Sequence, residues 1–196
     1  MADVSIGTGA NDGNYMTTLF NSGLVTLRIG NYSGSARNVF LLFTGVTISS
    51  GATIDAAKLT LQAGGTDSAT TVNCDIDAND ASNPSAPTTY SQCWNATRTS
   101  ASVSWPGLGS WSAGSDYDTS SLQSIVAELQ ASYDYSSGSN MLFFLEDDSS
   151  SSSANRRVAA YENTSYEEPE LHITYTETGG VSVPAIFYSY RRRRTQ

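Results

Sequence analysis

Apolar and polar residues alternate along short segments of this chain, and this alternation limits the structures that it can adopt. Residues 57–62 read AKLTLQ and residues 72–77 read VNCDID, so every second residue is apolar in both segments. Successive side chains of a β-strand point to opposite faces of a sheet, so each of these segments has one face to bury. A chain that repeats this pattern buries those faces by packing one sheet against another.

Similar runs occur along most of the sequence, separated by clusters of Gly, Ser, Asn, Asp and Pro that favour turns. We predict further strands within residues 24–29, 38–48, 101–105, 141–145, 156–165 and 171–175. Pro106 is expected to end the strand at 101–105, because proline interrupts a hydrogen-bonded ladder. With about eight to ten strands at hairpin spacing, we predict an all-β protein, an antiparallel, jelly-roll-like β-sandwich.

One segment departs from the alternation and has the periodicity of a helix. Its apolar residues fall at positions i, i+3, i+4 and i+7, namely Leu122, Ile125, Val126 and Leu129. This spacing places them on one face of a helix. Ser120 and Gln123 have the spacing of a capping box at its start. We therefore predict a single short helix over residues 120–132.

Charge divides the chain into two unequal parts. Residues 1–190 hold six basic and nineteen acidic residues, a net charge of −13, whereas Arg191–Arg194 add +4. An acidic body argues against binding to nucleic acid or to an anionic membrane, since both require a basic surface. The composition also changes after Gly180. We predict a sandwich domain over residues 1–177 and an extended C-terminal docking arm over residues 178–196.

Three interpretations compete for this arm: a nucleic-acid arm, a disordered solubility tail and a docking element. The acidic body would repel nucleic acid, and a disordered tail rarely carries so many apolar and aromatic residues. We favour docking, in which apolar side chains fill a groove or add a strand on a partner, and guanidinium groups pair with its carboxylates. The predicted docking residues are Phe187, Tyr188, Tyr190, Arg191, Arg192, Arg193 and Arg194.

The order of several short motifs resembles that of a known family. VFLLFTGVTISSGATIDAAKLTLQA at residues 39–63, VSW at 103–105 and PELHITY at 169–175 follow one another. Over residues 24–176 they resemble the DNRLRE-type and carbohydrate-binding-module-like β-sandwich domains of bacterial, archaeal and phage surface proteins. The family often has Arg before Phe in the first motif, where this chain has Leu42. The resemblance implies adhesion, structure or glycan contact without a catalytic set, and the aromatic, basic end is similar to small phage virion proteins.

Aromatic residues between positions 90 and 117 are candidates for sugar contact, because sugar-binding modules stack glycans on exposed Trp and Tyr side chains. Trp94 and Trp111 lie in loop-like contexts with Tyr117 nearby, so these three are the candidate glycan-contact residues. Trp105 is expected in the core, because it shares its strand face with apolar neighbours. Packing across loop ends is the favoured interpretation for Trp94 and Trp111 taken singly.

Signals for other chemistry are weak. Oxygen ligands lie close together at Asp75, Asp77, Asn79 and Asp80, a weak candidate for a Ca²⁺ site. The favoured alternative is a solvated strand edge that leads into an Asn/Asp turn. His172, the single histidine, is expected to point to solvent, so we predict no catalytic residues and no other cofactor. Cys74 and Cys93 are compatible both with one disulfide and with two buried thiols.

These observations together predict a structural protein without enzymatic activity, on the surface of a phage virion. It is expected to be a capsid decoration (cement) or fibre-like protein and to form oligomers. Its expected partners are other virion shell proteins or copies of itself, with no binding to nucleic acid or to membranes. The alternative is a non-catalytic glycan-binding domain for adhesion, extracellular or on a cell surface, that contacts host-surface glycans.

Overall fold

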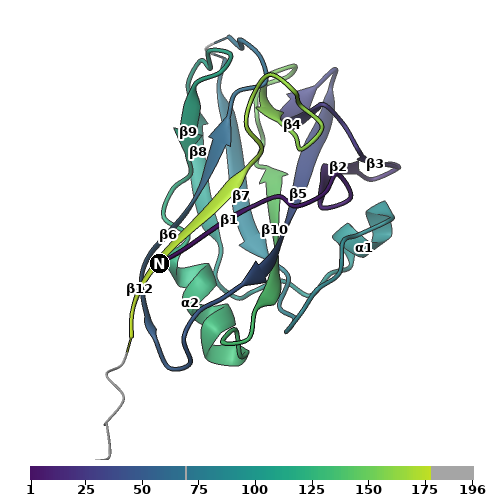
Figure 1. Cartoon of the computed structure of the whole chain (residues 1–196). Coiled ribbons are helices and arrows are strands. Elements are labelled where there is room, and N and C mark those ends of the chain that lie inside the picture. Colours follow the sequence, from purple (N-terminus) through teal and green to yellow (C-terminus); the bar gives the residue numbers. More distant parts are fainter. Residues whose placement is uncertain (69, 178–196) are drawn as a thin grey trace, which may run out of the picture.

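Two antiparallel β-sheets pack face to face in the structure, a computed structural model in which residues 1–68 and 70–177 are described (Figure 1). The smaller sheet has the order β1 (Ala2–Ser5), β12 (Glu170–Thr176), β6 (Thr53–Gln62) and β9 (Asp116–Asp118). The larger sheet has the order β11 (Asn155–Ala159), β4 (Thr26–Tyr32), β5 (Ser35–Val46), β10 (Ser139–Asp147), β7 (Val72–Ala78) and β8 (Val103–Leu108). A hairpin of β2 (Asp12–Met16) and β3 (Leu19–Ser22) extends the larger sheet, because β2 also pairs with β5. The predicted antiparallel sandwich is confirmed.

The apolar side chains of the alternating segments fill the space between the two sheets. Leu59 and Leu61 of β6 are completely buried, and so are Val72, Cys74 and Ile76 of β7. The residues between them in each strand are exposed or half-buried. These side chains meet in one core, where complete burial of an aliphatic side chain contributes about 1.5–3 kcal/mol.

The central strands β5 and β10 are apolar on both of their faces. Side chains on the face turned away from the smaller sheet form a second cluster, the outer cluster, which consists of Tyr15, Phe40, Leu42, Cys93, Leu142 and Phe144. Segment 79–99 covers this face and contains a one-turn helix, α1 (Tyr90–Trp94). The continuous apolar runs at 39–43 and 141–145 therefore belong to strands that are buried on both faces.

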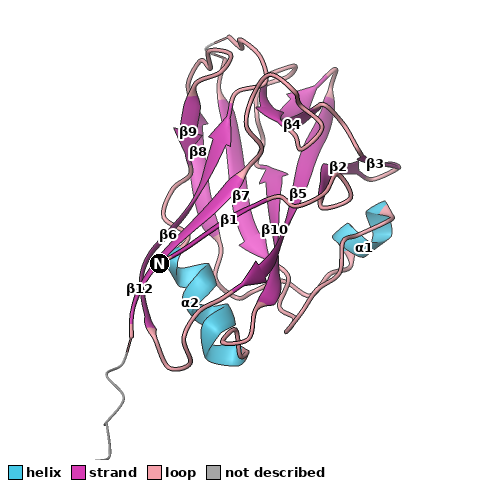
Figure 2. Ribbon diagram, in the orientation of Figure 1, coloured by secondary structure: helices cyan, strands magenta, loops and turns pink. Residues whose placement is uncertain are grey.

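Two helices are present in the described ranges, whereas the sequence predicted one. The second helix, α2 (Gln123–Ser132), agrees with the helix predicted over residues 120–132 and closes one end of the sandwich (Figure 2). Its residues Ile125, Val126 and Leu129 are buried in the core between the sheets. The sequence does not predict α1, because a single helical turn is too short to show a periodicity.

The capping box predicted at the start of α2 is wrong, and a cap of that kind is found at α1 instead. Leu122 is the N-cap of α2 and makes no side-chain cap hydrogen bond. The Gln123 side chain donates to the Ile54 carbonyl at 2.8 Å, which ties α2 to β6. At α1, the Thr89 hydroxyl accepts from the Gln92 N–H at 3.4 Å, and the Gln92 side-chain carbonyl accepts from the Thr88 N–H at 2.6 Å. The Thr-x-x-Gln spacing was therefore a usable signal for α1.

Pro106 lies inside β8, so the expectation that it ends this strand is wrong. Within the described ranges β8 pairs only with β7, which makes it an edge strand. An edge strand has one side without a ladder, where a missing backbone N–H costs no hydrogen bond. The register shift between Val72 and Cys74 of β7 lies opposite this proline.

Both cysteines are free and buried, which decides between the two alternatives left by the sequence. Cys74 lies in the core between the sheets, whereas Cys93 belongs to the outer cluster. The two thiols are thus on opposite faces of the larger sheet, and no disulfide can join them without a rearrangement of the backbone.

The predicted docking arm, residues 178–196, lies outside the described residues, and so do all seven predicted docking residues, Phe187, Tyr188, Tyr190, Arg191, Arg192, Arg193 and Arg194. The division of the chain at residue 177 therefore stays a prediction. In the ranges that the structure describes, neither helix is long and apolar enough to cross a membrane.

A buried arginine holds together the loops at one end of the sandwich. Arg156 of β11 is completely buried. Its guanidinium donates to the carbonyls of Gly109 and Leu108, both at 2.5 Å, and of Thr70 at 2.8 Å. Burial lowers the pKa of Arg156, and the charge of Asp67 opposes this effect. Carbonyl dipoles of three loop residues thus stabilise a charge that has left water.

Replacing Arg156 with Met should destabilise the fold by about 3–5 kcal/mol, because the buried Leu108 carbonyl and the carbonyls of Gly109 and Thr70 lose their shared donor. Urea unfolding of the variant and of the parent protein measures this loss. Lys58→Ala is the matched control, since it removes a positive charge from an exposed ion pair, 2.6 Å from Asp118. This control should cost less than about 1 kcal/mol, and equal losses in both variants would contradict the role assigned to Arg156.

Candidate functional site

A groove of about 570 Å³ lies on the outer face of the larger sheet. It is bounded by the β2–β3 turn, the start of β5, the end of β10 and the last residue of α1. Its lining combines apolar side chains with both signs of charge and includes Met16, Leu19, Arg37, Trp94, Glu146 and Asp147. We call it the Trp94 groove and consider it the candidate functional site.

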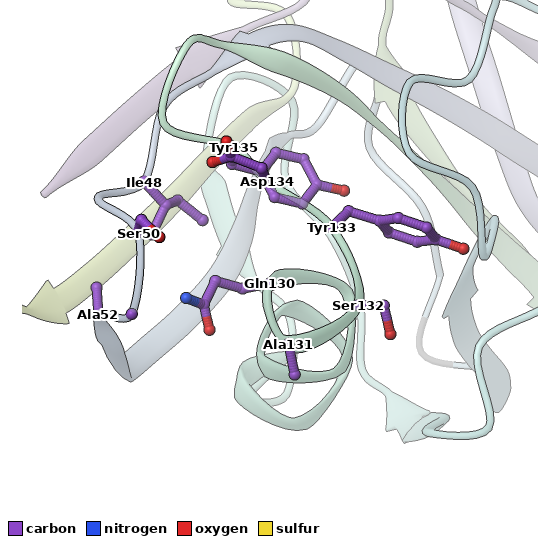
Figure 3. A pocket seen from close by; sticks show the side chains of 10 residues that line it. Ile48, Ser50, Ala52, Gln130, Ala131, Ser132, Tyr133, Asp134 and Tyr135 are labelled. Carbon is purple, nitrogen blue, oxygen red and sulfur yellow. The ribbon is translucent and has the colours of Figure 1, made fainter.

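A second hollow, of about 410 Å³, lies beside the end of α2 (Figure 3). Asp134 is the acidic residue of its lining, and no basic residue is among the described lining residues. The Asp134 carboxylate accepts from the Ser136 N–H at 2.9 Å, which lowers the pKa of Asp134. This hollow has neither an exposed Trp nor opposite charges, and the Trp94 groove has both.

Trp94 is exposed because of the way that α1 is anchored. Cys93 is completely buried in the outer cluster, and the next residue in the helix points away from it. As a result, 58% of Trp94 is accessible to solvent. Arg98 Nη2 donates to the Cys93 carbonyl at 2.9 Å and so holds the C-terminal end of α1 in place.

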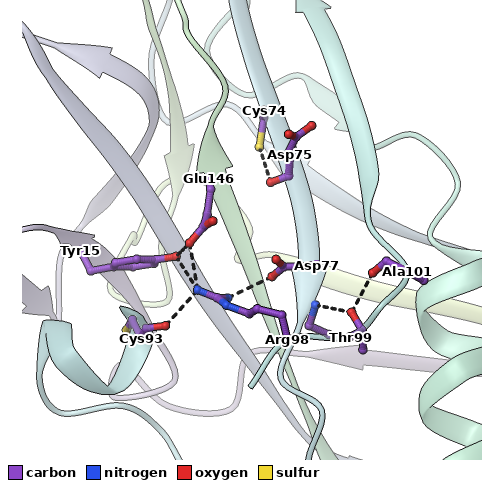
Figure 4. Close-up of polar contacts among 10 residues, drawn as sticks. Tyr15, Cys74, Asp75, Asp77, Cys93, Arg98, Thr99, Ala101 and Glu146 are labelled. Atoms are coloured by element: carbon purple, nitrogen blue, oxygen red, sulfur yellow. Dashed lines mark hydrogen bonds and ion pairs between the residues drawn. The ribbon is translucent and has the colours of Figure 1, made fainter. Parts of the chain in front are cut away.

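Arg98 also connects the groove wall to three strands (Figure 4). Its Nη1 lies 3.0 Å from Asp77 Oδ1 of β7, and its Nη2 lies 2.9 Å from Glu146 Oε1 of β10. The Tyr15 hydroxyl of β2 donates to the same Glu146 oxygen. The guanidinium carbon lies 3.4 Å from the centroid of the Phe144 ring, in cation–π contact. These five residues, the Arg98 cluster, hold Glu146 in the wall of the groove.

Burial governs the protonation of this cluster. It raises the pKa of Asp77 to about 6, although the Arg98 charge acts in the opposite direction. Burial and the Glu146 charge raise the pKa of Tyr15, so its hydroxyl stays protonated and donates. Burial also raises the pKa of Cys93 to about 12, which leaves it a thiol rather than a reactive thiolate. At neutral pH the cluster therefore places a charged Arg98 between two carboxylates.

The three predicted glycan-contact residues do not share one surface. Trp94 is exposed, as glycan contact requires, whereas only 2% of Trp111 is accessible. Trp111 forms an isolated bridge with Asp67, and its ring stacks on Tyr117 with centroids 4.4 Å apart. Trp105 packs against the core as expected, with its ring 6.1 Å from Trp111. Packing across loop ends, the favoured interpretation, is confirmed for Trp111 and is wrong for Trp94.

The four residues predicted as a weak Ca²⁺ site do not converge on a cation. Asp77 faces Arg98, whereas Asp80 accepts from the Tyr133 hydroxyl at 2.8 Å. Asp75 is exposed, and Asn79 forms a bridge with Arg98 in the backbone ladder. The side chains of Asp77 and Asp80 thus bind Arg98 and Tyr133, whereas Asp75 lies on a solvated edge, and the calcium hypothesis for this segment stays a prediction.

His172 lies on the outer face of β12, as predicted. Its Nδ1 is 2.9 Å from Asp3 Oδ1 and its Nε2 is 3.5 Å from Glu170 Oε2. Among the described residues no serine forms a hydrogen bond with this ring. The neighbours of His172 are thus two surface carboxylates.

Sequence reasoning found Trp94 but missed the Arg98 cluster that supports it. Tyr15, Arg98 and Glu146 lie far apart in the chain. The pairing of β2 with β5 and of β5 with β10 brings Tyr15 to Glu146, and the bridge between Asn79 and Arg98 brings the arginine to the end of β7. Each of them, taken alone, is an ordinary residue of a turn or strand end. No local pattern in the sequence distinguishes them.

Comparison with known proteins identifies no family for this chain. No protein-family model matches it, and no curated protein is significantly similar to it. The resemblance to DNRLRE-type and carbohydrate-binding-module-like domains implies a β-sandwich, and the structure has this architecture, with two antiparallel sheets. The function that this resemblance implies stays a prediction.

Replacing Arg98 with Met should destabilise the protein by about 2–4 kcal/mol near pH 8, because Asp77 and Glu146 lose their shared cation. The loss should shrink near pH 5: the pKa of Asp77, about 6 in the parent protein, rises further without Arg98, so a proton replaces the cation. Urea unfolding at both pH values measures the difference. A loss that is independent of pH would contradict this electrostatic role.

Proposed function

We propose that the protein is a structural surface protein of a phage virion, which docks onto shell proteins or copies of itself through residues 178–196. The observation that supports this most is the separation of charge along the chain. Residues 1–177 carry −13 and Arg191–Arg194 carry +4. The body of a neighbouring copy is therefore a surface of the sign that the arginines of the arm can bind.

The described body holds far more acidic residues than its own basic residues neutralise. Its ion pairs with Lys or Arg involve four carboxylates, those of Asp67, Asp77, Asp118 and Glu146. Exposed acids outside these pairs occur on several elements and include Asp55, Asp75, Asp116 and Asp148. An arm from another copy therefore finds carboxylates on the surface without any rearrangement of the body.

The apolar part of the arm would supply most of the affinity. Burial of each large side chain of the segment 183–190 contributes about 1.5–3 kcal/mol, whereas the arginines mainly speed association and select the partner. β1 and β8 are edge strands of the two sheets and are open to the addition of another strand. Pro184 restricts such an added strand to an outermost position.

Removal of residues 178–196 should abolish self-association, because both the apolar and the basic part of the arm are lost. Analytical ultracentrifugation of the full chain and of residues 1–177 tests this. Two matched variants separate the contributions: Arg191–Arg194 changed to Gln, and Phe187, Tyr188 and Tyr190 changed to Ser. Raising the salt concentration from about 0.05 M to about 0.5 M should weaken the self-association of the full chain and leave that of the Gln variant unchanged.

A full chain that stays monomeric at every salt concentration would overturn docking between copies. The arm would then require a different shell protein as its partner. A truncated chain that associates as strongly as the full chain would overturn any role of the arm in assembly.

A second candidate function, non-catalytic glycan binding, is supported by the Trp94 groove. An indole that is 58% exposed offers a face on which a sugar ring can stack. Arg37, Glu146 and Asp147 line the same groove and can form hydrogen bonds with sugar hydroxyls. Because Glu146 is held by the Arg98 cluster, part of this site is ordered before a ligand arrives.

Trp94→Ala should abolish any retention of the protein on a glycan array, with a change in stability within about 0.5 kcal/mol. Tyr90→Ala is the control, since Tyr90 is another exposed aromatic residue of α1 but does not line the groove. Trp111→Ala should instead destabilise the fold by about 3–5 kcal/mol. Equal retention of the parent protein and of Trp94→Ala would contradict glycan binding at this groove.

A further inference from the structure

Asp12 is a completely buried carboxylate at the start of β2. Its Oδ2 accepts the Tyr161 N–H at 2.9 Å. Its Oδ1 is also buried and has no hydrogen-bond partner among the described residues. Buried polar atoms normally have a partner, because the loss of water otherwise costs free energy.

Glu162, the residue after Tyr161, supplies a second oxygen of this kind. Its Oε2 is buried and has no hydrogen-bond partner in the described part of the chain. Its carboxylate lies against Gly9, where an added Cβ would stand 1.4 Å from Oε1. An added Cβ on Gly23 would stand 3.8 Å from the same oxygen. The absence of a side chain at Gly9 thus makes room for the Glu162 carboxylate, whose charge acts on Asp12.

Negative charge dominates this place. The charged groups that act on Asp12 are Glu162 and Glu168. None of the ion pairs formed in residues 1–68 and 70–177 involves any of these three acids. Burial raises the pKa of Asp12 to about 7, and the two neighbouring carboxylates act in the same direction. A buried carboxylate next to the buried oxygen of a second one requires a positive partner or a proton.

We propose that Asp12 and Glu162 bind a hard divalent cation, with Ca²⁺ as the favoured ion. Asp12 Oδ1 and Glu162 Oε2 are the carboxylate ligands, and backbone carbonyls and water complete a set of about six to eight oxygens. The described residues contain no group of three or more His, Cys, Asp or Glu side chains placed to hold a metal. A shortage of side-chain ligands is compatible with Ca²⁺, which accepts carbonyls and water, and disfavours Zn²⁺.

The proposed cation joins two loops that come from distant parts of the chain. Residues 6–11 lead from β1 in the smaller sheet to β2 in the larger one, and Glu162 lies in the loop between β11 and β12. Gly23 donates to the Gly9 carbonyl at 3.1 Å, so the chain between β3 and β4 meets the same place. A cation here would stabilise the crossings between the two sheets.

Thermal unfolding and isothermal titration calorimetry with CaCl2, MgCl2 and EDTA test the site on the full chain. At about a hundredfold excess over Kd, Ca²⁺ should raise the Tm of the parent protein by about 5–10 °C. Asp12→Asn and Glu162→Gln should each lose this shift and the heat of binding. Asp148→Asn is the matched control, because it removes an exposed acid from the loop after β10 and should keep the full shift.

Absence of binding heat and of a Tm shift in the parent protein would overturn the proposal. An equal shift in parent and both variants would place the cation elsewhere and overturn it as well. If Asp12→Asn fails to fold, Glu162→Gln decides, since its carboxylate lies at the half-exposed side of the site.

Discussion

The arrangement of this protein depends on the pairing of β5 with β10. Both strands are apolar on both faces, so the sheet that they form must be covered twice. The smaller sheet and α2 cover the inner face, as in any sandwich. The outer face is covered by the β2–β3 hairpin and by segment 79–99, which has little secondary structure of its own. Arg98 fastens that segment, since one guanidinium binds carboxylates on β7 and β10 and the carbonyl end of α1.

The exposure of Trp94 and the shape of the Trp94 groove follow from the way that segment 79–99 covers the outer face. Cys93 must be buried to anchor α1, and the geometry of one helical turn then leaves Trp94 in solvent. Glu146 is held in the groove wall because the same cluster uses its Oε1. A ligand in the Trp94 groove would therefore meet an ordered wall and an exposed ring. The proposed docking arm would instead depend on the long-range electrostatic attraction between its basic segment and the acidic bodies of other copies.

The acidic excess of the body has two separate consequences. Most acids are on the surface, where they are solvated and available to a basic partner. Asp12 is not, because the crossing between the sheets takes it out of water, and one oxygen of the half-buried Glu162 is buried as well. Burial of like charges is unfavourable unless a proton or a cation balances them. The acids on the surface are therefore available to bind a basic partner, whereas Asp12 and Glu162 affect the stability of the crossing between the two sheets.

Local patterns in the sequence determined the longer strands, β4 to β8 and β10 to β12, and the helix α2, because neighbours along the chain decide which face is apolar. They did not predict the short strands β1, β2, β3 and β9. The alternation in β6 and β7 and the periodicity of α2 needed no tertiary information. The outward position of His172 was also visible in this way, whereas the exposure of Trp94 was not. Tertiary structure decided the rest: whether Trp111 meets Tyr117 or solvent, whether Asp77 faces Arg98 or a cation, and whether Pro106 lies on an edge. Each depends on a partner supplied by a distant segment, and a single sequence records periodicity along the chain but not contact between its remote parts.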